Sequence, residues 1–267
     1  MECKICRHET EFLWKARILG KYDIAYYKCP FCAFIQTEQA YWLTEAYSGV
    51  IAETDIGYVT RNIMYSRRVD RIARWSFPEV RRFLDYGGGY GLFVRLMRDR
   101  GFDFYRQDLY CDNIFARSFD VEDLRRDADE GRFGLVTAFE VFEHLDNPRE
   151  ELDRMFRYAD SILFSTELQP RQPLKNMGDW WYFAPHMGQH IALYSLRTLE
   201  TIAEAYGCHL YSDGKSLHLL TKKKLSFNTV KWVSLAGRAA DTIFGRDFQN
   251  RKSLLMTDLQ RIQQESY

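Results

Sequence analysis

The stretch that most restricts how this chain can fold is residues 82–101, RFLDYGGGYGLFVRLMRDRG. Apolar residues lead into Asp85, and after a cluster of glycines further apolar residues recur at helical spacing. The glycines are Gly87, Gly88, Gly89 and Gly91. This pattern predicts a strand, a tight turn and a helix. Glycine permits positive φ and close approach to the backbone, and the helix start offers free N–H groups, so we expect a nucleoside to bind at this turn.

The rest of the central region alternates between strand and helix patterns, as in a doubly wound sheet. Strands are expected at 102–107, 113–119, 133–139 and 161–165, and helices at 59–77, 148–158 and 194–206. A final hairpin is expected from 208–212 and 216–221, which flank Asp213-Gly214. Residues 81–222 therefore predict an α/β, Rossmann-like domain that ends in an antiparallel hairpin.

Asp108 follows the expected second strand, about twenty residues after the glycine turn. An acid at this place can accept hydrogen bonds from both ribose hydroxyls of a nucleoside cofactor. A solvated loop acid is the alternative. Together with the glycine turn, the ribose interpretation is favoured.

Four cysteines form two pairs, Cys3-x-x-Cys6 and Cys29-x-x-Cys32. Two such knuckles suit tetrahedral Zn²⁺ held by four thiolates, which leave no open position, so a structural zinc is expected. Disulfides are the alternative, and the absence of a secretory signal disfavours them. Short apolar and aromatic runs at 12–18 and 22–27, divided by Gly20, predict the hairpin of a zinc ribbon. Residues 1–45 are therefore expected to form a zinc-binding module.

Charge and hydropathy limit the partners. The 37 basic and 37 acidic residues cancel, so no global field attracts a polyanion, and no nucleic-acid partner is expected. The N-terminus has no apolar signal region, and no run reaches the roughly 18 apolar residues of a membrane span. We expect a cytoplasmic protein without a transmembrane segment.

The segment TAFEVFEHLDNP supplies candidate catalytic groups at the end of the expected strand 133–139. His144 follows Glu143 there, and His186 and His190 lie in a later loop expected to cover the same edge of the sheet. A histidine titrates near neutrality and can take a proton from a hydroxyl. We predict His144 as general base and His190 as an orienting residue or metal ligand, with a purely structural role for these histidines as the alternative.

The glycine turn with its preceding acid, Asp108, and TAFEVFEHLDNP together resemble the class I S-adenosylmethionine (SAM) dependent methyltransferases. The resemblance implies that Gly87, Gly89 and Gly91 line the methionine part of SAM, that Asp85 lies near them, and that Asp108 holds the ribose. No distinctive third motif for the adenine is present. Phe119 and Asp120 are the candidates for it, and Glu140 is a further candidate cofactor residue.

Residues 1–222 also resemble an uncharacterised bacterial group of zinc-knuckle methyltransferases associated with surface-polysaccharide and sugar modification. By that resemblance the acceptor is a sugar or glycan hydroxyl, and the aromatic loop at 180–183 suits stacking on a sugar ring. The alternative is an RNA-directed methyltransferase, or a non-catalytic module, in which the zinc ribbon recognises nucleic acid.

A second resemblance concerns a catalytic metal. Glu140, Glu143 and His144 stand at i, i+3 and i+4, which would place them on one face of a helical turn. With a later histidine they resemble the Glu-x-x-Glu-His plus His arrangement by which certain methyltransferases of ubiquinone precursors and RNA 3′ ends bind Mg²⁺ or Mn²⁺. Similar strings also occur in relatives that bind no metal, so both interpretations stay open.

Two segments flank the expected sheet. Residues 46–80 are expected to form a helical linker or lid, and residues 223–267 a helical extension. The extension is basic and amphipathic. Packing on the domain or on a second copy, as in a homodimer, is favoured over binding at a membrane interface.

Overall fold

The computed structural model describes residues 1–47, 56–124, 133–244 and 251–265. The chain divides into two compact units. The first comprises Met1–Ala52, Phe139–Arg154 and Phe164–Lys224. The second comprises Glu53–Ala138, Met155–Leu163 and Leu225–Tyr267. These boundaries differ from the four segments expected from the sequence, because residues 1–45 share a unit with much later parts of the chain.

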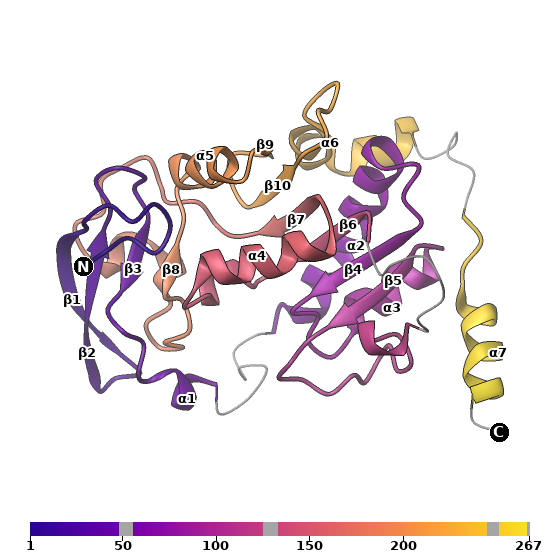
Figure 1. The fold of residues 1–267 in the computed structure, drawn as a ribbon, viewed down its shortest axis with the longest axis horizontal. Coiled ribbons are helices and arrows are strands. Elements are labelled where there is room, and N and C mark those ends of the chain that lie inside the picture. The colour runs from indigo at the N-terminus through magenta and orange to yellow at the C-terminus, as the bar shows by residue number, and fades with distance from the viewer. Residues whose placement is uncertain (48–55, 125–132, 245–250, 266–267) are drawn as a thin grey trace. The chain divides into compact units, whose positions relative to one another are not determined.

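A six-stranded mixed sheet runs in the order β5-β4-β6-β7-β10-β9 (Figure 1). Its strands are β4 (Arg82–Tyr86), β5 (Asp103–Gln107), β6 (Leu135–Ala138), β7 (Ser161–Ser165), β9 (His209–Ser212) and β10 (Leu217–Thr221). Strand β4 is parallel to both β5 and β6, whereas β9 and β10 are antiparallel. The prediction of a Rossmann-like α/β sheet with a final antiparallel hairpin is confirmed.

The strand expected at 113–119 is not formed. Asn113 closes a local turn instead, because its Oδ1 accepts the N–H of Ala116 at 2.9 Å and its Nδ2 donates to the carbonyl of Ala116 at 2.6 Å. Among the described residues at this place, one isolated parallel bridge, between Arg106 and Asp120, is the only pairing with the sheet. A side chain that bonds the backbone a few residues away competes with strand pairing, which explains the loop.

The second unit packs its helices through residues at helical spacing. Helix α2 (Tyr58–Ser76) buries Tyr65, Val69, Ile72 and Ala73, which recur on one face. Helix α3 (Leu92–Asp99) begins directly after the glycine turn, and α6 (Thr229–Phe244) meets α2, where the hydroxyls of Ser76 and Thr229 lie 2.9 Å apart. The helix predicted at 59–77 is therefore confirmed.

A buried ion pair attaches the C-terminal helix α7 (Leu255–Glu265) to the second unit. The guanidinium of Arg98 donates to both carboxylate oxygens of Asp258, at 2.9 and 2.8 Å, and also to Asp103 at 2.6 Å. Arg98 and Asp258 are 4% and 3% exposed. This bidentate geometry satisfies two charges that are both removed from water.

The first unit contains a second sheet, in the order β1-β2-β3-β8 (Figure 1). Strands β1 (Glu11–Ile18) and β2 (Tyr22–Lys28) form the hairpin predicted for the ribbon. Strand β3 (Ile35–Thr37) pairs with β8 (Ala192–Leu193), which lies more than 150 residues later in the chain. The ribbon is thus not a separate body.

Three further helices are α1 (Leu43–Ala46) and α5 (Leu196–Ala205), which belong to the first unit, and α4 (Pro148–Tyr158), whose residues are divided between the two units. Helices α4 and α5 agree with the helices predicted at 148–158 and 194–206. Ser195 caps α5, since its side chain accepts the N–H of Thr198 at 3.1 Å.

Aromatic residues form the core of the first unit. Trp180, Tyr182 and Phe183 are 7%, 4% and 1% exposed, and they pack with Trp42 and Tyr26. The expectation that the whole loop at 180–183 could stack on a sugar is therefore corrected, since only Trp181, at 73% exposure, presents its ring to solvent. Trp181 begins a short 3₁₀ turn, Trp181–Phe183, whose other two rings point into the core.

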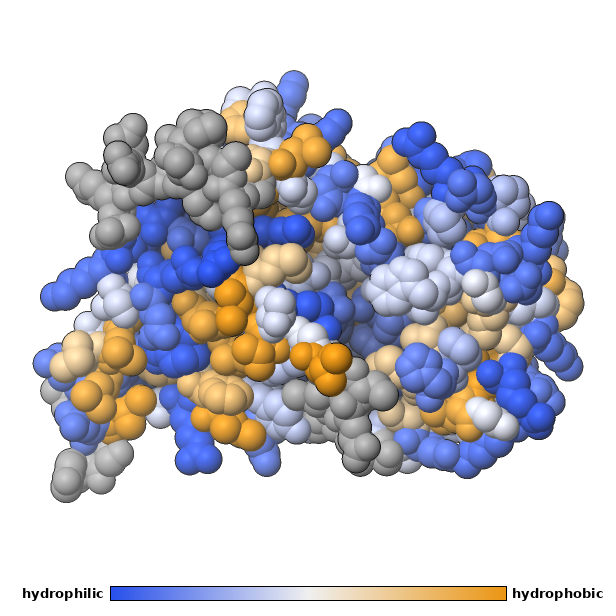
Figure 2. All heavy atoms as spheres, turned by 180° about the vertical axis from the view of Figure 1, so that it is seen from behind, coloured by the Kyte–Doolittle hydropathy of each residue, from blue (hydrophilic) through white to orange (hydrophobic). Residues whose placement is uncertain are grey.

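Apolar side chains also stand exposed among hydrophilic ones on the face drawn in Figure 2. Within the described residues, no helix combines the length and the apolar character needed to cross a bilayer.

We predict that Asp258→Asn lowers the free energy of unfolding by about 3 kcal/mol, because it leaves the buried Arg98 guanidinium without its bidentate partner. Asp99→Asn is the matched control. Asp99 pairs with Arg95 but is 42% exposed, and such a pair contributes about 0–1 kcal/mol. Urea unfolding measures both. Equal losses in the two variants would contradict a buried anchor at Asp258.

Candidate functional site

The glycine turn after β4 has the left-handed backbone that only glycine adopts readily. Gly87, Gly89 and Gly91 have φ values of 67°, 53° and 82°. Gly91 is also the N-cap of α3, so the free N–H groups of that helix begin at the turn. The structure confirms the strand, turn and helix predicted from the sequence.

Space around the turn differs from one glycine to the next. A Cβ atom at Gly88 would lie 2.7 Å from the side chain of Arg106, and one at Gly91 would lie 2.7 Å from Asn113. At Gly89 the nearest atom would be the hydroxyl of Tyr58 at 3.6 Å. The protein therefore fills one side of the turn and leaves the side at Gly89 open to a ligand.

Asp108 lies directly against this turn. One of its carboxylate oxygens accepts the N–H of Gly89 at 2.8 Å, and the other accepts the N–H groups of Tyr110 and Cys111 at 2.8 and 2.9 Å. A carboxylate has about four acceptor positions, so one or more remains for a hydroxyl. The structure thus brings together the glycine turn and the acid predicted to hold a ribose.

Asp85 lies behind the turn and is 4% exposed. Its Oδ1 accepts the hydroxyl of Thr137 at 2.6 Å. Burial raises the pKa of Asp85 to about 7, and the hydrogen bond from Thr137 offsets only part of this effect. Asp85 therefore supports the turn from the protein side.

Arg106 is a residue of this site that our sequence reasoning missed. It is 5% exposed, and its guanidinium donates to Asp120 at 2.6 Å, to the carbonyl of Cys111 at 2.9 Å and to the carbonyl of Gly89. The available signal was an arginine inside a strand that is otherwise buried, because such a charge must find partners. Arg106 fixes the turn and the Asp108 loop relative to each other.

The position of Phe119 corrects the expectation that it contacts an adenine. Its ring is fully buried, with the Arg98 guanidinium carbon 3.7 Å from the ring centroid and Tyr105 at 6.3 Å. Both neighbours belong to the protein interior. Phe119 is therefore a packing residue, and the carboxylate of Asp120 is engaged by Arg106.

A second group of ionisable residues lies in the first unit. Glu143, His144 and His190 each offer a ligand atom, and these atoms lie within 4.8 Å of one another. Glu143 is fully buried, and its carboxylate oxygens make no hydrogen bond of normal geometry with the described residues, although the Tyr182 hydroxyl lies close enough to lower its pKa. Burial, with a contribution from nearby Glu140, raises its pKa to about 7. A buried carboxylate without a well-formed hydrogen bond is unusual and favours a cation or a donor group beside it.

Backbone carbonyls fix the tautomers of both histidines. Nδ1 of His144 donates to the carbonyl of Gln189 at 3.1 Å, and Nδ1 of His190 donates to that of Tyr182 at 2.5 Å. A carbonyl only accepts, so each Nδ1 carries a proton and each neutral ring keeps a lone pair on Nε2. Burial lowers the pKa of both histidines, and their mutual repulsion lowers that of His190 further. Both rings are thus suited to accept a proton or bind a metal.

The single helical turn expected over Glu140, Glu143 and His144 is not formed. Glu140 has a left-handed φ of 56°, and the 3₁₀ turn covers only Phe142–His144. Ser165 holds Glu140, since its Oγ accepts the Glu140 N–H and donates to Oε1, both at 2.8 Å. Glu140 therefore acts on Glu143 through its charge and lies outside the group of three.

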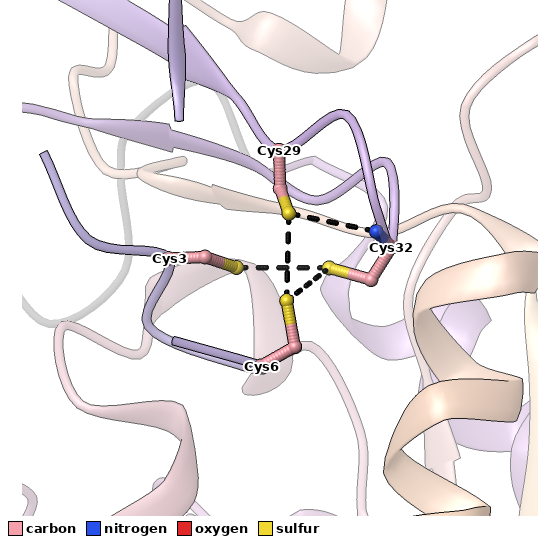
Figure 3. A group of neighbouring side chains, drawn as sticks. All are labelled: Cys3, Cys6, Cys29 and Cys32. Carbon is pink, nitrogen blue, oxygen red and sulfur yellow. Dashed lines mark hydrogen bonds between the residues drawn. The ribbon is translucent and has the colours of Figure 1, made fainter. Parts of the chain in front are cut away.

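Four cysteine sulfurs converge in the first unit, as Figure 3 shows. The Sγ atoms of Cys3 and Cys32 are 3.6 Å apart, those of Cys6 and Cys29 3.4 Å, and those of Cys6 and Cys32 3.5 Å. A tetrahedron with metal–sulfur bonds of about 2.3 Å has edges of about 3.8 Å. The four sulfurs are therefore spaced for one tetrahedral metal ion.

The two cysteine pairs adopt the same backbone. After each pair the next residue is left-handed, with φ of 66° at Arg7 and 61° at Ala33. The N–H of Arg7 bonds the Cys3 carbonyl at 3.0 Å, and that of Ala33 bonds the Cys29 carbonyl at 2.9 Å. The N–H groups of Ile5 and Cys32 point at the sulfurs of Cys3 and Cys29. Such donors stabilise thiolates, so the cluster fits a metal.

A family model described as a methyltransferase domain matches residues 60–213, which is more than half of the chain. The chain belongs to this methyltransferase family. It is a SAM-dependent methyltransferase, as the glycine turn and Asp108 led us to expect. No curated protein sequence matches this methyltransferase.

Several solved structures are similar to this methyltransferase. An O-methyltransferase family protein from Burkholderia thailandensis is 11% identical with a TM-score of 0.41, and 68% of each chain is covered. TnmH is 15% identical with a TM-score of 0.42, covering 68% of this chain and 61% of TnmH. Magnesium protoporphyrin IX methyltransferase from Synechocystis PCC 6803, with bound SAH, is 13% identical with a TM-score of 0.42, covering 68% of this chain and 95% of that one.

We predict that Gly89→Val weakens SAM binding by about tenfold or more, equivalent to about 1.4 kcal/mol or more, because a branched side chain occupies the open side of the turn. Titration calorimetry measures the affinity. Gly214→Val is the control for backbone strain, since Gly214 has a φ of 80° and nothing within 4 Å of its Cβ position. Unchanged SAM affinity in a folded Gly89→Val variant would refute this placement.

Proposed function

We propose that this enzyme methylates a hydroxyl of a sugar or glycan, such as a surface polysaccharide or a sugar nucleotide. The observation that carries the proposal is the group of buried Glu143 with His144 and His190, in which two neutral imidazoles present Nε2 lone pairs. A hydroxyl becomes a good nucleophile only when its proton has an acceptor, and such a group supplies one.

Chain topology supports assigning this group to the methyl-transfer reaction. The glycine turn follows β4, the segment 140–144 follows β6, and these two strands are parallel neighbours. Open α/β sheets bind their ligands beyond the carboxyl ends of their strands. Bound SAM supplies an electrophilic methyl group, and the chain must supply the orientation of the acceptor and a place for its proton.

His144 is the residue that we assign as the general base. Its Nδ1 is held by the Gln189 carbonyl, so Nε2 is the atom that takes the proton. Nε2 lies 4.0 Å from Oε1 of Glu143, and that carboxylate stabilises an imidazolium once the proton has arrived. His190, whose ring centroid is 5.0 Å from that of His144, orients the acceptor or shares a metal.

An exposed aromatic ring beside His144 supports a sugar acceptor. Tyr47 is 42% exposed, and its ring centroid lies 6.1 Å from that of His144 in an edge-on arrangement. The apolar face of a pyranose packs well on such a ring, while the hydroxyls remain free to react. Trp181 is a second exposed ring in the same unit.

A divalent metal is the alternative role for the same group. One carboxylate and two imidazoles, completed by water, suit Mn²⁺ and, less well, Mg²⁺. Glu143, His144 and His190 would then hold the ion, which would lower the pKa of an acceptor hydroxyl. The oxygens of Glu143 lack a well-formed hydrogen bond among the described residues, which favours a cation there, whereas Ser165 hydrogen-bonds Glu140.

We further propose a structural zinc at Cys3, Cys6, Cys29 and Cys32. Four sulfurs at tetrahedral spacing leave no open coordination position, so the ion would have no catalytic role. The carbonyl of Cys32 accepts the hydroxyls of Ser195 and Thr198 at 3.3 and 2.8 Å. The site would therefore stabilise the junction of the ribbon with α5.

We predict one zinc per chain, and we expect Cys29→Ser to lose the zinc and to unfold at lower denaturant concentration, since metal binding contributes folding free energy. Elemental analysis and chelator-dependent unfolding measure these effects. Cys208→Ser is the control, because Cys208 lies outside the cluster. Substoichiometric zinc in a protein that stays folded through chelation would exclude the site.

We predict that His144→Ala lowers kcat by about two to four orders of magnitude while SAM affinity stays unchanged, because the base acts only in the transition state. His190→Ala should raise the KM for the acceptor. The measurement is methyl transfer from labelled SAM to a panel of nucleotide sugars and glycans, with and without chelator.

His186→Ala is the matched control for both variants, since His186 lies in the same loop but is exposed. Loss of activity on chelation, restored by Mn²⁺ or Mg²⁺, would assign the group to a metal. Near wild-type turnover in both His144→Ala and His190→Ala would show that these histidines are structural and that positioning alone drives the reaction.

A further inference from the structure

The first half of helix α6 has two faces of opposite exposure. Val230 and Val233 are 0% and 1% exposed and pack into the second unit, together with Thr229. Trp232 and Leu235, at i and i+3 on the other face, are 60% and 73% exposed. The helix therefore packs on the second unit through one face, and Trp232 and Leu235 lie on the opposite face, exposed to solvent.

The helix start is held rigidly. The side-chain oxygen of Asn228 accepts the N–H of Lys231 at 2.9 Å, and the Asn228 carbonyl accepts that of Trp232 at 3.1 Å. Phe227, directly before this cap, is 46% exposed. We define Phe227, Trp232 and Leu235 as the apolar surface of α6.

The surrounding sequence is basic. No acidic residue occurs between Asp213 and Asp241, whereas this segment contains six basic ones, Lys215, Lys222, Lys223, Lys224, Lys231 and Arg238. The whole chain has a formal net charge of zero, so this is a local concentration of positive charge. Lys231 is exposed and adjoins Trp232 on the helix.

The local positive charge distinguishes between two possible partners of this surface, a second copy of the chain and a lipid membrane. A symmetric second copy would place this basic segment against itself, and like charges in contact oppose association. An anionic lipid surface instead attracts lysine, while tryptophan, leucine and phenylalanine enter the boundary between headgroups and acyl chains. No described helix can cross a bilayer, so the contact would lie in the plane of the interface.

We propose that the apolar surface of α6 docks this enzyme on an anionic membrane surface. The helix lies along the interface, with Phe227, Trp232 and Leu235 inserted and Lys231 at the lipid phosphates. The inference is independent of the acceptor and of the roles assigned to the histidines.

The test is co-sedimentation of the full chain with phosphatidylcholine vesicles that contain about 30% phosphatidylglycerol, against vesicles of phosphatidylcholine alone. We expect binding to the anionic vesicles that weakens at high salt. The double variant Trp232→Ser/Leu235→Ser should lower the partition coefficient by about tenfold, and Lys231→Glu by a similar factor.

The matched control is Leu255→Ser/Met256→Ser on α7, where the two side chains are 53% and 61% exposed. This variant removes a comparable apolar area outside the basic segment and should bind vesicles like the wild type. Thermal unfolding and SAM titration establish that all variants are folded. Equal binding to neutral vesicles, absence of binding, or a lower mass of the α6 variant in light scattering, which would reveal a second copy on this surface, would each overturn the proposal.

Discussion

The buried guanidinium of Arg106 is the group on which the cofactor-binding turn depends. It joins the carbonyl of Gly89, the carbonyl of Cys111 and the carboxylate of Asp120, which belong to three separate stretches of backbone. Arginine stays charged and has a rigid planar fork, so it is satisfied only when all three acceptors are in place. The turn is therefore shaped by the protein from behind, and the ligand meets a site that is already formed.

The regular elements of the sheet could be predicted because their signals are local. Pro148 begins a helix, Asp213-Gly214 forms a hairpin, and the run at 133–139 contains a buried strand. The segment 113–119 was wrongly predicted as a strand, since the turn closed by Asn113 depends on its side chain bonding the backbone of Ala116. The pairing of β3 with β8 has no local signal at all.

The candidate site was predictable in its chemistry but not in its geometry. The spacing of the cysteines predicted the four-sulfur cluster, and the adjacent Glu143 and His144 predicted the second group that the structure brings together. The carbonyls of Gln189 and Tyr182, which fix the histidine tautomers, cannot be read from any side-chain pattern. Phe119 was wrongly predicted to contact the ligand, because an aromatic residue followed by an acid gives the same sequence pattern in a protein core as in a binding site.

The pairing of β3 with β8 bears on whether the ribbon can be treated as a removable part of this enzyme. A segment can be removed cleanly only if every remaining strand keeps its neighbours, because an unpaired strand edge exposes backbone hydrogen-bonding groups. The cysteine ribbon does not meet this condition, because Ile35 and Gln36 pair with Leu193 and Ala192, on a strand that begins two residues after His190. Removing the ribbon would therefore also expose the edge of β8 and disturb the loop that carries a candidate catalytic residue.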